Sequence, residues 1–340
     1  MKHSSKNFLH NRIPLLYTAT SVLLVSVAVL SLLSGSTTLP LFELITSLIR
    51  GELASSSARI FLYIRLPRTL AALVAGGALA CAGALAQGTL HNRLATPSIL
   101  GVNSGAGLAI TIASAFGVIG GMLTSVLAFS GALSATLLIV FFSKRFGLSR
   151  ANVILCGVAL NSLFGALTSA IITFFPDVGV MSNDFRVGDF SSVNFRSLAP
   201  ASVIILVTLA FSFTLSNDLD ALSLGDEGAF ALGLSPSRLR LLFMLLVSLL
   251  SAAAVSLCGL LSFVGLIVPH ALRMLGVGKS AHLLPLSALL GAAFVTLCDT
   301  LSRVLFAPYE IPVGILMAIL GAPFFLFLLF SKKGEKHGRM

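Results

Sequence analysis

The sequence predicts an all-α membrane protein with about ten transmembrane helices, on the evidence of its composition, the length of its apolar runs and the distribution of its charges. Of its 340 residues, 56% are hydrophobic and only 10% are charged. One water-soluble core cannot bury that much apolar surface, so a large soluble domain is excluded. A helix that crosses a bilayer needs roughly 20 apolar residues, and the chain has enough of them for about ten crossings.

Fitting helices to the apolar runs gives ten spans joined by short connections. They cover residues 13–34, 69–89, 98–117, 121–142, 151–174, 198–215, 239–260, 262–275, 283–304 and 312–330. Because the number of spans is even, both termini are expected on the same side of the membrane. The whole chain, 1–340, is expected to form a single transmembrane domain.

The net charge of +10 follows this membrane topology and does not indicate a nucleic-acid-binding surface. Fifteen of the 22 lysines and arginines fall on the side that holds the termini, and these include all seven lysines. The positive-inside rule therefore places both termini in the cytoplasm. The seven basic residues on the outer side are all arginines: Arg50, Arg59, Arg65, Arg68, Arg186, Arg196 and Arg303.

Two of these outer arginines, Arg65 and Arg68, stand three residues apart just before a long span, with Pro67 at its start. Residues at this spacing share one face of a helix, and a guanidinium group can pair with a carboxylate through two parallel hydrogen bonds. The pair could therefore recognise acidic groups, or it could anchor the helix among lipid headgroups. Arg303, preceded by Asp299, allows the same two interpretations.

Residues 217–236 form a cytoplasmic segment of soluble character. Gly225, Gly233 and Pro236 divide it into short helical pieces, and Asp226 and Glu227 stand where they would cap the second piece. Its apolar residues are too few to bury one another, which favours a docking surface for another protein; the alternative is a segment that lies on the membrane surface. These apolar residues are Leu219, Leu222, Phe230 and Leu232.

No catalytic or metal-binding pattern is visible in the sequence. The stretch from Gly276 to Ser280 resembles the tail of a phosphate-binding loop, but the position of its leading glycine holds Arg273 and no strand precedes it. No pair of carboxylates suits acid and base roles, and the four cysteines stand singly in apolar stretches. Neither enzymatic activity nor a bound metal or cofactor is expected.

Five segments resemble the FecCD-type permeases, the membrane subunits of ABC importers for iron(III)-siderophores, haem and cobalamin. They are IRLPRTLAALVAGGALACAGALAQG (64–88), LATPSILGVNSGAG (94–107), LSFVGLIVPHALRML (261–275), LLPLSALLGA (283–292) and EIPVGILMAILGAPFFLFLL (310–329). The resemblance implies a multi-pass permease of the bacterial cytoplasmic (inner) membrane that forms a homodimer around a central path. It also implies two cytoplasmic ATP-binding subunits and one extracytoplasmic solute-binding protein as partners.

The resemblance further implies roles for single residues. Arg65, Arg68 and Arg303 match the outward arginines that pair with glutamates of the binding protein. Asn92 and Leu94 match a cytoplasmic gate loop between the second and third spans, in which Arg93 stands where the family usually has proline. The segment 217–236 matches the helices that couple the permease to the ATPase. The residues expected in that contact are Leu219, Leu222, Gly225, Asp226, Glu227, Phe230, Leu232 and Gly233.

The expected cargo is an iron(III)-siderophore or a related metal chelate, with haem or cobalamin as alternatives. A transporter of a different class, driven by an ion gradient, would need an essential carboxylate at mid-membrane. Only Asp299 approaches that condition, and it stands near a helix end beside Arg303. An enzyme embedded in the membrane is a third possibility, but the spans lack clustered carboxylates.

Overall fold

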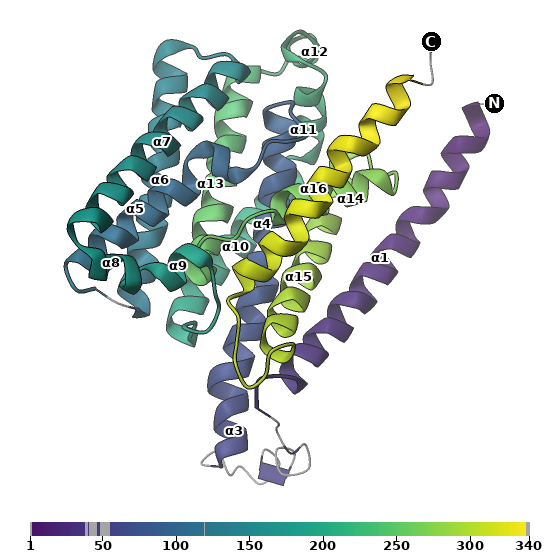
Figure 1. The fold of residues 1–340 in the computed structure, drawn as a ribbon. Coiled ribbons are helices and arrows are strands. Elements are labelled where there is room, and N and C mark those ends of the chain that lie inside the picture. The colour runs from purple at the N-terminus through teal and green to yellow at the C-terminus, as the bar shows by residue number, and fades with distance from the viewer. Residues whose placement is uncertain (1, 38–39, 41–45, 48–54, 119, 338–340) are drawn as a thin grey trace.

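The structure, a computed structural model, describes residues 2–37, 40, 46–47, 55–118 and 120–337, and of residues 2–12 and 327–337 it describes the backbone alone. The described chain is helical throughout and contains no strand (Figure 1). Arg50, one of the outer arginines, lies outside the described residues.

Seven helical segments of the described chain are long and apolar enough to cross a membrane. They are α1 (Lys2–Leu33), the continuous segment Ser56–Thr89, α6 (Gly121–Phe146), α7 (Arg150–Phe174), α10 (Phe195–Thr214), α13 (Pro236–Cys258) and α15 (Ser280–Val304). Three of the ten expected spans correspond to shorter apolar helices: α5 (Val102–Ala115), α14 (Val264–Met274) and the first part of α16 (Val313–His337). Short helices complete the chain: η2 (Pro97–Leu100), α8 (Pro176–Met181), α9 (Asn183–Val187), α11 (Ser216–Ser223) and α12 (Asp226–Ala231).

The second expected span begins at Ser56 and not at residue 69. Helix α3 (Ser56–Ile60) continues through a π-helical turn (Phe61–Arg65) into α4 (Leu66–Thr89). In this turn the amide of Leu66 donates to the carbonyl of Phe61, five residues back. The wider turn explains why Pro67, which cannot donate, interrupts neither helix. Arg65 and Arg68 therefore lie within a helix and not at its N-terminus.

Helix α4 occupies the centre of the bundle, where it packs against α10, α13, α14 and α15. Small residues allow this close packing. A Cβ atom on Gly83 would lie 2.0 Å from the carbonyl oxygen of Gly265 in α14, and one on Gly76 would lie 2.4 Å from that of Gly291 in α15. Any larger residue at either position would push the helices apart.

Helices α1 and α7 lie at the periphery. In the most apolar window of the Ser56–Thr89 segment 83% of the residues are buried, against 17% in α1 and 11% in α7. The apolar faces of these two helices are therefore left for lipid or for another protein chain.

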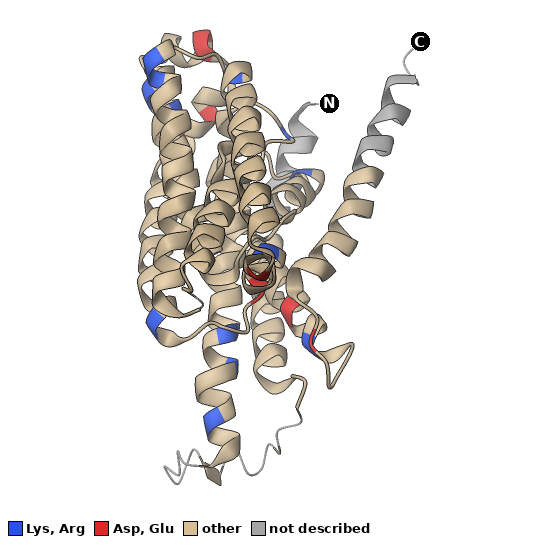
Figure 2. Cartoon of the chain, turned by 60° about the vertical axis from the view of Figure 1, so that its left-hand side comes forward, with Lys and Arg blue, Asp and Glu red and all other residues tan. Residues whose placement is uncertain are grey.

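The two ends of the bundle carry different features. The described chain ends, α11 and α12 lie at one end, and α3 lies at the other (Figure 1). Charged residues, blue and red in Figure 2, lie towards the two ends of the bundle and are sparse between them. By the predicted orientation, the end with α12 faces the cytoplasm and the end with α3 faces outward.

Candidate functional site: an outer arginine cluster and a coupling segment

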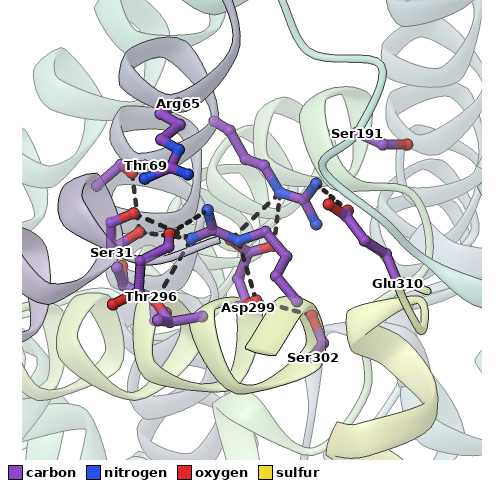
Figure 3. Close-up of polar contacts among 12 residues, drawn as sticks. Ser31, Arg65, Thr69, Ser191, Thr296, Asp299, Ser302 and Glu310 are labelled. Atoms are coloured by element: carbon purple, nitrogen blue, oxygen red, sulfur yellow. Dashed lines mark hydrogen bonds and ion pairs between the residues drawn. The ribbon is translucent and has the colours of Figure 1, made fainter. Parts of the chain in front are cut away.

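At the predicted outer end, Arg68 pairs with three carboxylates from three different parts of the chain. Two of these carboxylates, Asp299 and Glu310, are labelled in Figure 3. The Nε of Arg68 donates to Asp299 Oδ1 of α15 at 3.0 Å. One terminal nitrogen donates to Glu310 Oε2 in the α15–α16 connection at 2.7 Å, and the other lies 3.4 Å from Asp189 Oδ1 in the α9–α10 connection. These contacts join the centre of the bundle to two outer loops.

Arg303 and Arg65 bind the C-terminal end of α1. Arg303 pairs with Asp299 at 3.1 Å and donates to the hydroxyl of Ser31 at 2.8 Å and the carbonyl of Ser34 at 3.2 Å. Arg65 donates to the carbonyls of Leu32 and Leu33, at 3.2 and 2.6 Å. The last carbonyls of a helix lack partners within the helix and attract positive charge. The two guanidinium groups therefore cap α1.

We call the six charged residues Arg65, Arg68, Asp189, Asp299, Arg303 and Glu310 the mouth cluster. The sequence led us to expect exposed guanidinium groups, and that expectation is wrong: Arg65, Arg68 and Arg303 are only 3%, 4% and 3% exposed. Capping and ion pairing within the chain account for their burial. The docking role proposed for them stays a prediction.

Glu310 is the most accessible acidic member of the mouth cluster, with a side chain that is 34% exposed. Burial alone would raise the pKa of this carboxyl, but hydrogen bonds from the Ser36 hydroxyl and from Arg68, together with the positive charge of Arg68, lower it overall. Glu310 is therefore a firmly ionised carboxylate at the solvent side of Arg68. Sequence reasoning missed it, and it missed Asp189 as well.

At the opposite end, the predicted coupling segment contains α11 and α12, and its four apolar residues differ in burial. Leu219 and Leu222 are buried in the core of the bundle, and Leu219 packs against Gly88 of α4. Phe230 is 74% exposed, and Leu232 is exposed as well. The prediction of a shared docking face is therefore wrong for Leu219 and Leu222, because they hold α11 onto α4. Leu224, which the sequence analysis did not single out, is exposed beside α12.

Asp226 holds α12 to two transmembrane helices. Its Oδ1 accepts from Arg150 of α7 at 2.5 Å and from Arg240 of α13 at 2.8 Å. Burial alone would raise the pKa of Asp226, but the hydrogen bonds and charges of the two arginines lower it. Gly225 and Gly233, on either side of α12, adopt positive φ angles of +105° and +77°, which suit glycine. Glu227 is exposed.

The predicted gate loop leads from the C-terminal end of α4 to η2. Asn92 Oδ1 accepts a hydrogen bond from the backbone amide of Leu94 at 2.9 Å, which closes a tight turn around Arg93. Leu94 is exposed on this turn. Both predicted gate residues thus lie on one turn, at the end of the bundle that holds α11 and α12.

Comparison with known proteins decides the family. The model of the FecCD transport family matches residues 23–331. The chain belongs to the FecCD transport family. It is 37% identical to the ferric enterobactin transport system permease protein FepD of Escherichia coli K12, over 92% of this chain and 93% of that protein. It is 36% identical to the hemin transport system permease protein HmuU of Yersinia pestis, over 82% of this chain and 85% of that protein.

A solved structure gives the same result. The fold matches an inward-facing conformation of a metal-chelate type ABC transporter with a TM-score of 0.80 and 33% identity, over 94% of this chain and 99% of that chain. This FecCD protein is accordingly a multi-pass inner-membrane permease of the metal-chelate type of ABC importer. Permeases of this family hydrolyse no ATP themselves and work with separate ATP-binding subunits and substrate-binding proteins.

Proposed function

We propose that this FecCD permease forms the translocation path for an iron(III)-siderophore or related metal chelate as a homodimer. The observation that carries the proposal is the family match over residues 23–331. FepD and HmuU are named for ferric enterobactin and for hemin, so similarity alone leaves haem as an alternative cargo, beside cobalamin.

A second copy of the chain is the partner that best suits the uncovered apolar face of α7. Only 11% of its most apolar window is buried, yet Asn161 on this helix hydrogen-bonds Ser98 and Ser104 towards the inside. Helix α7 is thus fixed to its own bundle through one face while the opposite face is free. Pairing of two such faces would place the translocation path between the subunits.

Coupling to the ATPase is assigned to α12. Its exposed apolar side chain Phe230, with Leu224 and Leu232 on either side, projects from the cytoplasmic end, and exposed apolar groups of this kind anchor protein interfaces. Asp226 joins α12 to α7 and α13. A shift of α12 on the ATPase would therefore act directly on two spanning helices.

Docking of the solute-binding protein is assigned to the mouth cluster. Arg68 is already paired on three sides, so an incoming carboxylate can reach it only by replacing one of its partners. Glu310 is the most exposed of the three. We infer that docking exchanges Glu310 for an acidic side chain of the binding protein on the same guanidinium group.

An ion-gradient mechanism finds no support at Asp299. This carboxylate is fully buried between Arg68 and Arg303, and both ion pairs use it. A group held in this way is a structural counter-ion and is not available to carry a coupling ion across the bilayer.

Uptake into proteoliposomes tests the proposed cargo. The permease would be reconstituted with its cognate ATP-binding subunit and solute-binding protein, and uptake of a labelled ferric siderophore, haem and cobalamin would be compared. The proposal predicts ATP-dependent uptake of the ferric siderophore. Uptake of haem or cobalamin without the ferric siderophore would show that the proposed cargo is wrong and would identify the actual one. Uptake of none of the three would refute the proposal.

A further inference from the structure

A cavity of about 450 Å³ opens at the cytoplasmic end, next to the predicted gate loop. Its wall is built from the C-terminal end of α4, the gate loop, α11, the end of α14 and the start of α15. Pockets that bind small ligands have volumes of roughly 300–1,000 Å³. The polar and charged residues of its lining are Gln87, His91, Asn92, Arg93, Asp220 and Arg273, with Ser223 and Ser280.

Arg273, in the last turn of α14, is held in this wall by a neutral partner. Its Nη1 donates to Gln87 Oε1. The amide nitrogen of Gln87 donates to the carbonyl of Gly265 at 3.0 Å, which fixes the side-chain oxygen of Gln87 towards Arg273. Within the described residues, no carboxylate lies within ion-pair distance of Arg273.

Arg93 adds a second positive charge to the same cavity. It stands exposed on the gate loop, and its charge acts unfavourably on that of Arg273. Asp220, the carboxylate in the described lining, is already used, because both of its oxygens accept from the backbone amide of Ser280, at 3.0 and 3.2 Å. The cavity thus holds two arginines and one engaged carboxylate.

Arg93 and Arg273 line one cavity with a single carboxylate, so one positive charge is left uncompensated, and a bound anion would offset it. Arginine is also the side chain best shaped to bind a carboxylate or phosphate group, through two parallel hydrogen bonds. In the mouth cluster, by contrast, Arg68 and Arg303 each lie within ion-pair distance of a carboxylate of the same chain.

We propose that this cavity binds the oxyanion groups of the transported chelate on the cytoplasmic side of the gate loop, through Arg93 and Arg273. The inference rests on the proposed function and narrows it, because it favours a chelate with free carboxylate or similar acidic groups over cobalamin. Arg93 belongs to the predicted gate loop, so the site would lie beside the cytoplasmic end of the path.

Equilibrium binding to the purified permease tests this assignment without any ATPase. The full chain would be placed in nanodiscs of phosphatidylcholine, and binding of labelled ferric citrate and of free citrate would be measured. Wild type should bind at least one of them saturably, and Arg93→Gln and Arg273→Gln should each weaken that binding by about tenfold or more. Arg238→Gln, which removes an exposed cytoplasmic arginine in the first turn of α13, should leave binding unchanged.

Absence of saturable binding, or equal binding in all four proteins, would overturn the proposal. Arg93 is exposed, so its substitution removes the charge without removing a packing contact, and the test does not depend on the folding of Arg273→Gln. Gel filtration would show that each variant is monodisperse.

Anionic lipid is the other source of the same chemistry. Phosphatidylglycerol in the nanodiscs should leave citrate binding in place if the chelate is the ligand. Loss of citrate binding in those discs would assign the cavity to lipid headgroups and overturn the assignment to cargo. ATP-dependent chelate uptake by a permease that binds no citrate would refute this inference alone, whereas citrate binding without ATP-dependent uptake would refute the proposed function alone.

Discussion

The arginines of the mouth cluster have two structural roles, because they cap the end of α1 and they pair with carboxylates. Arg65 and Arg303 cap α1, while Arg68 and Arg303 share Asp299. A buried ion pair adds little net stability, but removal of one partner leaves an uncompensated charge in a low-dielectric site. The cluster should therefore be sensitive to loss of any central member.

Replacement of Asp299 by asparagine tests this sensitivity. The variant leaves Arg303 without an ion-pair partner among the described residues. We expect the free energy of unfolding to fall by about 3–5 kcal/mol. Thermal unfolding of the purified protein in detergent should show a clear fall in melting temperature. Asp177→Asn, at an exposed position of α8, serves as the control, and equal melting temperatures for the two variants would contradict the account.

Glu310 gives a second test at this scale. If it occupies Arg68 until the binding protein arrives, Glu310→Gln should tighten docking by about two- to fivefold, because a partly exposed ion pair is worth up to about 1 kcal/mol. Docking affinity would be measured by surface plasmon resonance with the cognate binding protein. Weaker docking of this variant would mean that Glu310 itself contacts the partner and does not compete with it.

The sequence identified the arginines of this cluster but not their surroundings. Asp299 and Arg303 are four residues apart on one helix, a spacing that can be read directly. Asp189 and Glu310 lie 121 and 242 positions from Arg68, and neither periodicity nor motif spacing connects residues that distant. Without these partners, the arginines could only be interpreted as exposed.

At the scale of elements, α11 and α12 divide the coupling segment into a buried part and an exposed part. The short helical pieces that the sequence predicted here are present, and Gly225 and Gly233 stand on either side of α12. The sequence could not separate Leu219 and Leu222 from Phe230 and Leu232, because short helices give too few turns to define a face. The difference comes from tertiary packing against α4.

Two substitutions in this segment compare an exposed apolar residue with a buried one. Phe230→Asp should leave the permease folded and reduce copurification of the ATPase, because the side chain is exposed. Leu222→Asp buries a charge in the core and should lower the yield of folded permease. Detergent gel filtration and copurification would separate the two effects, and undiminished copurification with Phe230→Asp would argue against docking at α12.

Asp226 should transmit motion without holding the complex together. Asp226→Asn weakens its ties to Arg150 and Arg240, and we expect chelate uptake per ATP hydrolysed to fall by roughly an order of magnitude while the ATPase still copurifies. Asp218→Asn on α11 removes the same charge from a residue that does not pair with Arg150 or Arg240. An equal ratio of uptake to ATP hydrolysis in the two variants would rule out a coupling role for the Asp226 ion pairs.

At the scale of the whole molecule, the sequence predicted the all-helical membrane fold and its family. Long apolar runs and extended motifs can be recognised without knowledge of tertiary contacts. The sequence placed the start of the second helix 13 residues late (69 against Ser56), since Pro67 suggested a helix start and the π-helical turn before it has no sequence signal. Three predicted spans proved to be short apolar helices.

The mouth cluster is tied to α1, α4 and α15 at one end of the molecule, and α12 is tied to α7 and α13 at the other. We infer that ATP hydrolysis supplies the energy for transport and acts on the permease at the cytoplasmic end. An ATPase moves the permease only if it binds the two conformations with different affinity, and α12 is the element through which that difference would act.

Uptake in proteoliposomes with a catalytically inactive ATPase tests whether ATP hydrolysis drives transport. The permease, its binding protein and either active or inactive ATP-binding subunits would be supplied with ATP, and chelate uptake would be followed with and without an ion gradient. If ATP hydrolysis drives transport, uptake occurs with the active subunit only, whatever the gradient. Uptake that follows the ion gradient and persists with the inactive subunit would contradict it.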